Sequence, residues 1–199
     1  MSHAETGMDR PEGAEGAREH RLRFSTANAL FAAFPVAKSD MRTKPTDDDC
    51  LTFLRALTAS ATPEEAVTFA AYLLPPREGV WWAHQCLSYL PEALTDVDNE
   101  MLAVVEAWVR DPDEINRNAA LEAANAAEVE SPGVWLAFAA GWSGGTMGPL
   151  SGGVVPPPPH LTPRCLNASV LGSLARIETQ HRPSLLKGFV EMAITLTEA

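Results

Sequence analysis

Residues 62–90 read TPEEAVTFAAYLLPPREGVWWAHQCLSYL, and this stretch decides the fold class. Thr62 precedes Pro63, and Glu65 follows two residues later, which is the pattern of a helix N-terminus with a capping box. Apolar residues then recur at helical spacing until the double proline at 75–76. Proline ends a helix interior but is tolerated in a first turn, so the stretch predicts two consecutive helices that meet at the prolines.

The same start and stop patterns continue on both sides of this stretch. Helices are predicted over residues 24–34, 46–57, 62–74, 76–90, 96 or 98 to 110, 113–127, 131–141, 162–177 and 183–196. The expected N-caps include Thr46, Asp113, Ser131 and Thr162. No segment is a convincing strand, so the fold class is all-α with seven to nine helices. Because most connections have two to eight residues, we expect antiparallel helical hairpins or an irregular bundle.

One connection is much longer than the others. The Gly/Pro-rich loop from Ser143 to Leu161 contains five glycines and the run Pro156 to Pro159. A connection of this length tends to be functional, mobile, or packed as an extended strap. The proline run should adopt polyproline II geometry, which suits an aromatic groove in another protein or a tryptophan of this chain. We favour stacking within the chain, and Trp142 carries the nearest ring.

Composition separates the start of the chain from the rest. Residues 1–22 mix Gly, Ala, Glu and Arg with almost no large apolar side chain, so burial cannot offset the entropy lost on ordering them. The remaining length suits one hydrophobic core. We therefore expect a flexible tail over residues 1–22 and a single helical domain over residues 23–199.

Charge and cysteine content restrict the expected partners and location. The formal net charge of -11 creates a negative field that repels phosphate backbones and anionic lipid headgroups, so nucleic acid and membrane surfaces are not expected partners. No apolar stretch reaches the roughly 18 residues of a membrane span, and the N-terminus lacks the order of a secretory signal. Cys50, Cys86 and Cys165 each lie within apolar runs and fit a reducing compartment. We expect a cytoplasmic protein.

One short segment of the sequence matches a known catalytic motif. Residues 141–145 read GWSGG and satisfy the G-x-S-x-G pattern, in which a turn between a strand and a helix exposes the serine. Here a helix is expected before Ser143 and a loop after it, so a glycine-terminated helix is the better interpretation. A hydrolase using Ser143 and His160 is the weakest alternative. No His or Cys pair has the spacing of a zinc chelate, so we expect no catalytic residue, cofactor or metal.

Aromatic residues supply the candidate binding surface. The chain has five tryptophans, and the adjacent Trp81 and Trp82 cannot both point inward from one helical turn. Core packing is favoured for each tryptophan taken alone. One of the pair is nevertheless a candidate to face a partner or the long loop. The candidate binding residues are Trp81, Trp82, Trp142, Ser143, Pro156, Pro157, Pro158, Pro159 and His160.

Four segments, residues 74–83, 107–112, 142–145 and 156–162, occur together in one order. They resemble an uncharacterised family of helical bacterial proteins, a domain of unknown function associated with type VI secretion gene clusters. The resemblance spans roughly residues 25–197. It implies a role beside a secretion apparatus as an adaptor, chaperone or accessory scaffold, and it transfers no catalytic residue.

These observations favour a non-enzymatic protein-binding or adaptor protein of unknown oligomeric state. Acidic helical proteins can cover a basic or apolar partner surface without any chemistry. The alternative is an immunity-type protein, whose acidity would mimic a nucleic-acid substrate and neutralise a basic toxin. The expected partner is therefore a secretion component, an effector or a toxin.

Overall fold

The computed structural model describes residues 23–147 and 155–198, which form ten α-helices and one short 3-10 helix. The helices are α1 (Ala27–Ala33), α2 (Ala37–Asp40), α3 (Cys50–Thr58), α4 (Glu64–Leu73), α5 (Pro76–Ser88), η1 (Pro91–Ala93), α6 (Asp96–Arg110), α7 (Glu114–Ala126), α8 (Pro132–Gly141), α9 (Leu161–Ala175) and α10 (Arg182–Glu198). Within the two described ranges there is no strand, and an isolated bridge pairs Thr26 with Asp49. The predicted all-α fold is confirmed.

The number of helices exceeds the predicted range because of a one-turn helix. α2 has four residues and follows Pro35, where the first helix was predicted to end. The N–H groups of Lys38 and Ser39 donate to the carbonyls of Pro35 and Val36. A helix this short has no periodic apolar pattern, so the sequence alone does not mark it.

Several predicted helix starts are confirmed. The Asp113 carboxylate accepts a hydrogen bond from the Asn116 N–H, and the Ser131 hydroxyl accepts one from the Val134 N–H. α6 begins with a reciprocal capping box, in which Thr95 precedes the predicted acidic start. The Thr95 hydroxyl accepts a hydrogen bond from the Asp98 N–H, and the Asp98 carboxylate accepts one from the Thr95 N–H.

The prediction that Thr46 caps the next helix was wrong. α3 begins at Cys50, and the Asp49 carboxylate accepts from the first N–H groups of the helix, those of Leu51 and Thr52, at 3.0 Å each. The Thr46 hydroxyl instead donates to the Asp48 carboxylate. A run of acidic residues offers several possible caps, and the bridge to Thr26 favours the last of them.

Two further predicted caps were wrong, and in each case a side chain of the predicted cap binds a distant segment. Thr62 makes no capping bond, and the Glu65 carboxylate accepts from the backbone N–H groups of residues 42–43 at 2.8 and 3.0 Å. Thr162 lies inside α9, and its hydroxyl donates to the Ala139 carbonyl of α8. Both partners are far away in sequence, so a local pattern does not reveal them.

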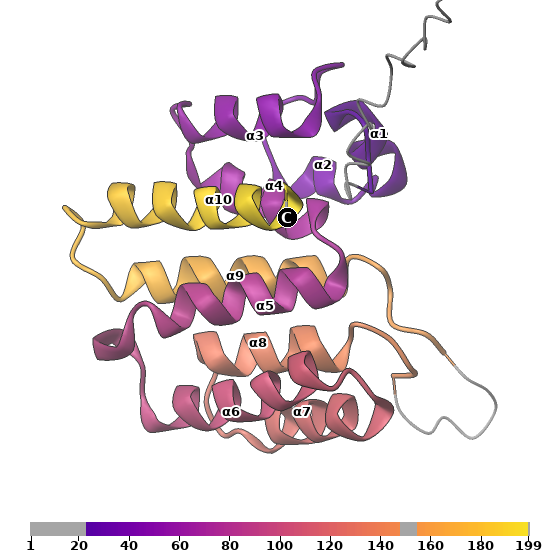
Figure 1. Ribbon diagram of the computed structural model, residues 1–199, viewed down its shortest axis with the longest axis vertical. Helices are drawn as coiled ribbons and strands as arrows, with labels where there is room; N and C mark the ends of the chain where they lie inside the picture. The colour runs from indigo at the N-terminus through magenta and orange to yellow at the C-terminus, as the bar shows by residue number, and fades with distance from the viewer. Residues whose placement is uncertain (1–22, 148–154, 199) are drawn as a thin grey trace, which may run out of the picture.

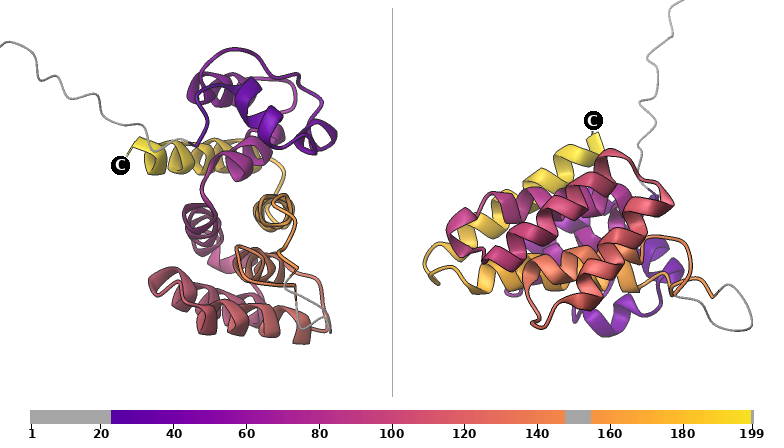
Figure 2. Two further views of the ribbon diagram at one scale, coloured as in Figure 1. Left: turned by 90° about the vertical axis from the view of Figure 1, so that its right-hand side faces the viewer. Right: turned by 90° about the horizontal axis from the view of Figure 1, so that it is seen from below.

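The helices stack in rows that run across the molecule (Figure 1). α1 to α3 lie at one end with α4 and α10 beneath them, α5 and α9 form the next row, and α8 packs on α6 and α7 at the other end. α10 returns to contact α3 and α4, so the last helix closes the bundle against the first ones. Figure 2 shows the same rows from two further sides. One connected set of buried apolar side chains runs from Ala27 to Ile194.

A buried carboxylate joins three of the helices. The Asp98 side chain on α6 accepts from the Gly133 N–H of α8 at 2.8 Å and from Arg176 at 2.5 Å. Burial by itself raises the pKa of Asp98. Hydrogen bonds from Ser131, Thr95, Arg176 and Gly133 outweigh burial and hold this pKa well below its usual value. A Cβ on Gly133 would lie 2.7 Å from the Asp98 Cα, so glycine permits this close approach.

The predicted flexible tail, residues 1–22, lies outside the described residues, as do residues 148–154 of the long loop. The two described ends of this loop meet, because the Met147 N–H donates to the Val155 carbonyl at 2.9 Å. Of the helices in the described ranges, none has the length and apolar character needed to cross a membrane.

Candidate functional site

The two adjacent tryptophans of α5 have different environments. Trp82 is fully buried, and its indole N–H donates to the Phe189 carbonyl of α10 at 2.8 Å. Trp81 is half-buried and stacks on the His84 ring, with centroids 5.4 Å apart and planes at 14°. Burial lowers the pKa of His84, although the nearby Glu106 carboxylate opposes this. One tryptophan therefore holds helices together and the other presents a supported ring at the surface.

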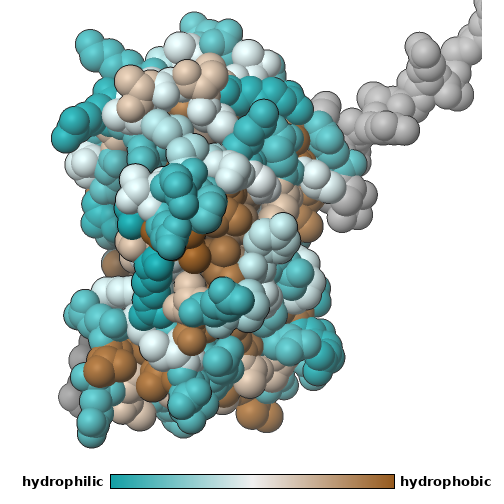
Figure 3. Space-filling model, turned by 90° about the vertical axis from the view of Figure 1, so that its left-hand side faces the viewer, coloured by the Kyte–Doolittle hydropathy of each residue, from teal (hydrophilic) through white to brown (hydrophobic). Residues whose placement is uncertain are grey.

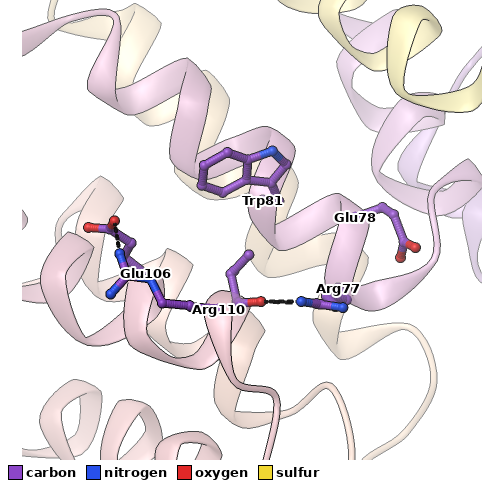
Figure 4. Close-up of a pocket in the computed structure, with 6 residues that line it drawn as sticks. Arg77, Glu78, Trp81, Glu106 and Arg110 are labelled. Carbon is purple, nitrogen blue, oxygen red and sulfur yellow. Dashed lines mark hydrogen bonds and ion pairs between the residues drawn. The ribbon is translucent and has the colours of Figure 1, made fainter. Parts of the chain in front are cut away.

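Trp81 lines a groove between α5 and α6, which we call the α5–α6 groove (Figure 4). Its volume is about 420 Å³. The Arg77 guanidinium donates twice to the Val109 carbonyl, at 3.0 and 2.7 Å, and Arg110 pairs with Glu106 at 2.6 Å. Figure 4 shows the first contact bridging α5 and α6, the second contact along α6, and the Trp81 ring on α5. Both arginines of the groove are thus already engaged within the protein.

Trp81 also lines the opposite side of α5. Two adjoining hollows of about 330 and 350 Å³ lie between α5 and α10 and share Gly188 and Met192, so we treat them as one α5–α10 groove. Its principal walls are Trp81 and Gln85 from α5, Tyr89 at the C-cap of α5, and Leu185, Gly188, Met192 and Leu196 from α10. Tyr89 is 68% exposed and packs edge-on against Phe189, with centroids 6.4 Å apart. Trp81 therefore lies between two surface grooves.

The long loop forms a third hollow, the strap cavity, of about 280 Å³. The structure brings five predicted site residues to its wall: Trp142, Ser143, Pro156, Pro157 and Pro159. The Trp142 ring stacks on Phe138, with centroids 4.7 Å apart and planes at 23°. Tyr72 of α4 and Leu166 of α9 complete the cavity from the helical body. The loop therefore packs its prolines and Trp142 around a shared space.

The other predicted site residues lie elsewhere. Pro158 and His160 do not line the strap cavity, and their carbonyls accept from the N–H groups of Leu161 and Arg164. Trp81 and Trp82 do not line it either, and no described residue is common to the strap cavity and the two α5 grooves. The candidate residues thus occupy two separate places on the molecule.

Ser143 follows the end of α8, and a helix rather than a strand precedes it. Its hydroxyl donates to the Ala140 carbonyl at 2.6 Å, which continues the hydrogen-bonding pattern of the helix end. Among the described residues, no hydrogen bond joins Ser143 to His160. The residues around Ser143 therefore have the local structure of a helix C-terminus.

Arg117 of α7 fixes the start of the loop and was not among the residues predicted from the sequence. It is 4% exposed, and its guanidinium donates to the Glu114 carboxylate and to the Gly141 carbonyl at the end of α8. Gly145 has a φ of +69°, and a Cβ there would lie 2.3 Å from the Arg117 Nη2. One pattern could have revealed this role, because Arg117, Ala120 and Ala124 share the spacing of a buried helix face.

The cysteines are all buried free thiols, as expected. Burial raises the pKa of Cys50 to about 11 and that of Cys165 to about 12, and it raises the pKa of Cys86 well above its usual value. High pKa values keep these thiols protonated and unreactive. In the described part of the chain, no group of three or more His, Cys, Asp or Glu side chains could hold a metal ion.

The α10 wall of the α5–α10 groove was also missed. Gly188 and Met192 lie about 100 residues after α5 in the sequence, so only the folded chain brings them beside Trp81. Two features could have drawn attention to this region: Gly188 interrupts an otherwise apolar helical pattern, and Tyr89 is an aromatic residue just past a helix end.

Fold and surface together define an all-α bundle with grooves around a half-buried tryptophan. Residues 53–197 match the Family of unknown function (DUF6931), and the chain belongs to this family. No curated protein and no solved structure matches the chain. The family match begins within α3, so α1 and α2 lie before it.

Proposed function

We propose that this protein is a non-enzymatic binding protein that recognises another protein through the surface around Trp81. The observation that supports this most is the position of the Trp81 ring, which lines grooves on both sides of α5. Tryptophan is among the residues that contribute most to protein interfaces, because it buries a large area with few rotatable bonds. His84 stacks beneath the ring and limits its motion, which lowers the entropy lost on binding.

The chemistry around Trp81 favours binding over catalysis. Arg77 and Arg110 are engaged with the Val109 carbonyl and the Glu106 carboxylate, so neither is arranged to meet a substrate anion. The buried His84 ring is covered by Trp81. On the α10 side of α5, the Trp81 ring lies beside apolar side chains such as Met192 and Leu196, which suits recognition of a protein surface.

The strap cavity has a supporting place in this proposal. Its prolines and Trp142 line one space within the chain, which favours the interpretation that the strap packs on its own protein. We therefore assign partner recognition to the Trp81 surface and a structural role to the strap.

The cellular context is proposed from the family resemblance. Similarity to bacterial proteins associated with type VI secretion gene clusters supports a cytoplasmic adaptor or accessory protein that works beside a secretion apparatus. Its partner would be a secretion component or an effector.

The test is quantitative affinity capture from the source cells with matched variants. Trp81→Ala removes the ring that lines both α5 grooves, and Trp135→Ala removes an equally half-buried tryptophan of α8 that lines none of the four hollows. We expect a secretion component or effector to be captured by the wild-type protein and by Trp135→Ala, and lost with Trp81→Ala. Equal capture by both variants would remove the Trp81 surface from the proposal.

The alternative function is neutralisation of a basic toxin, and the distribution of charge favours it. Residues 92–130 contain eleven Asp or Glu residues and two Arg residues. These residues cover α6 and α7 at one end of the molecule (Figure 1). If this alternative holds, the combined Glu122→Lys and Glu128→Lys substitutions should abolish capture of a toxin, whereas Trp81→Ala should leave it unchanged.

A serine hydrolase remains the third and weakest alternative. Labelling of the folded protein with a serine-reactive phosphonate tests it directly. We expect no modification of Ser143, because its hydroxyl is bonded to the Ala140 carbonyl. A covalent adduct that the Ser143→Ala variant lacks would establish this alternative.

A further inference from the structure

The α5–α10 groove is bounded by two antiparallel rows of side chains. Trp81 and Gln85 of α5 and Tyr89, the C-cap of this helix, form a row at four-residue spacing, and the facing row on α10 runs from Leu185 to Leu196. The hydrogen bond from the Trp82 indole N–H to the Phe189 carbonyl fixes the separation of the two helices beneath the groove. The walls therefore belong to a rigid part of the fold.

The dimensions of the groove suit a helix. Leu185 and Leu196 are eleven residues apart, which corresponds to about 16 Å or about three helical turns. Side-chain ridges of two packed helices leave a seam into which a third helix fits. An extended segment would instead place unpaired backbone groups against apolar walls, because no sheet edge exists among the described residues.

Gly188 opens the groove at its centre. It lines both adjoining hollows, and a Cβ built on it would have no neighbour within 4 Å. On the neighbouring turns of α10, side chains such as Leu185 and Met192 line the groove, whereas at Gly188 the corresponding space is empty. A side chain of a bound helix can enter this space as a knob enters a hole.

The exposed surface of the groove is mainly apolar. Figure 3 shows the side of the molecule on which α5 ends and α10 begins. Hydrophobic surface is concentrated near the middle of that face. Leu185, Met192 and Leu196 contribute from α10, and the 68% exposed Tyr89 contributes from α5. Methionine adapts its shape to different apolar partners. An exposed apolar groove of this kind favours an amphipathic segment.

The charge of the groove indicates which side chains should flank the apolar stripe of the bound segment. Glu191 is the one charged residue that lines the two hollows, and it has no ion pair within the described chain. Glu78, in the adjoining α5–α6 groove, also has no ion pair among the described residues, whereas the exposed Lys187 does not line either hollow. With a net charge of -11 for the whole chain, these carboxylates favour a partner with positive edges.

We infer that the α5–α10 groove binds an amphipathic α-helix of a partner protein that inserts an apolar stripe and carries lysine or arginine along its edges. This inference rests on the proposed protein-binding function and specifies the chemistry of the partner. The bound helix lies between α5 and α10, covers Trp81 and Tyr89, and places its positive edge beside Glu191.

The test uses a labelled model peptide of about 18 residues, with leucine at heptad positions a and d and lysine at the edges. Its affinity for the full-length protein is measured by fluorescence anisotropy at physiological salt. Gly188→Leu fills the groove, and Gly188→Ala makes the same backbone change with a much smaller side chain. We expect Gly188→Leu to weaken binding by about ten-fold or more and Gly188→Ala to leave it nearly unchanged.

A second matched pair of variants tests the requirement for opposite charge. Glu191→Lys should weaken binding of the lysine peptide, whereas Glu64→Lys, an equal charge change at an exposed position of α4 outside the groove, should have little effect. A peptide with glutamate in place of lysine should bind more weakly than the lysine peptide. Circular dichroism of each variant verifies that its fold is retained.

Three results with the purified protein would overturn the inference. The first is equal binding by Gly188→Leu and Gly188→Ala, and the second is equal binding of the glutamate and lysine peptides. The third is a wild-type dimer that Gly188→Leu converts to a monomer, because the groove would then bind a second copy of this chain. In the cell-capture experiment, the informative result is a partner that is lost with Trp81→Ala and retained with Gly188→Leu. That result would refute binding of a helix in the α5–α10 groove but would agree with the proposed protein-binding function.

Discussion

Gly145 and Arg117 show how one backbone conformation anchors the loop. Gly145 adopts a φ of +69°, and a Cβ would come within 2.3 Å of the buried Arg117 guanidinium. We expect Gly145→Ala to lower the free energy of unfolding by about 2 kcal/mol, because it combines left-handed backbone strain with displacement of Arg117 from its carboxylate and carbonyl partners. Urea unfolding measures the change.

The neighbouring glycine supplies the control for this prediction. A Cβ on Gly144 would meet nothing within 4 Å, so Gly144→Ala should change stability by only a few tenths of a kcal/mol. Equal losses in the two variants would mean that the contact with Arg117 does not stabilise the fold.

Asp98 gives the protein a specific pH dependence. Its pKa in the folded protein lies below the unfolded value of about 3.9, so its contribution to stability is complete above about pH 5 and is lost as pH falls through 4 toward the folded pKa. Asp98→Asn should cost about 3 kcal/mol at pH 7, because Arg176 and the Gly133 N–H lose a charged partner. Urea unfolding at a series of pH values checks this.

The pH series distinguishes the buried carboxylate from an ordinary one. The stability gap between wild-type protein and Asp98→Asn should stay constant near neutral pH and narrow below about pH 4. Asp96→Asn, an exposed carboxylate in the same helical turn, should show a much smaller gap. A gap for Asp98→Asn that persists unchanged at low pH would contradict the role assigned to its charge.

At the scale of elements, the sequence predicted the helices better than their first residues. Apolar periodicity and proline positions located the nine longer helices, because these patterns depend on residues within each helix. Caps failed where a polar side chain had a distant partner, as with Glu65 and the N–H groups of residues 42–43. Such partners come from tertiary packing, which a local pattern does not contain.

Two threonines test this distinction at the helix termini. Thr95→Ala should lower the free energy of unfolding by about 1 kcal/mol or more, because its hydroxyl caps α6 and also donates to the buried Asp98 carboxylate. Thr62→Ala should have little effect, because that side chain makes no capping bond. Chemical unfolding of both variants provides the comparison, and a larger loss for Thr62→Ala would support the capping box that the sequence indicated.

At the scale of the whole molecule, the candidate site was predictable only in part. Adjacency in sequence correctly indicated that Trp81 and Trp82 would differ in burial, because this follows from the geometry of one helix. Gly188 and Met192 complete the groove from α10, which packs beside α5 only after the bundle has closed. Half of the groove therefore depends on topology, and no motif within either helix encodes it.

The extent of the folded unit gives a final prediction. The family match begins at Phe53, yet Phe31 of α1 packs against Phe53 and Phe69 with centroids 6.5 and 6.3 Å apart. A chain of residues 49–199 loses this contact and the hydrogen bond from Tyr72 to Asp40. Burial of each large apolar side chain contributes about 1.5–3 kcal/mol to the free energy of unfolding. We expect this shorter chain to melt well below the full chain in thermal circular dichroism, whereas residues 23–199 should melt with the full chain, because residues 1–22 offer almost no large apolar side chain. Equal melting temperatures for residues 49–199 and the full chain would place the boundary of the folding unit at the start of the family match.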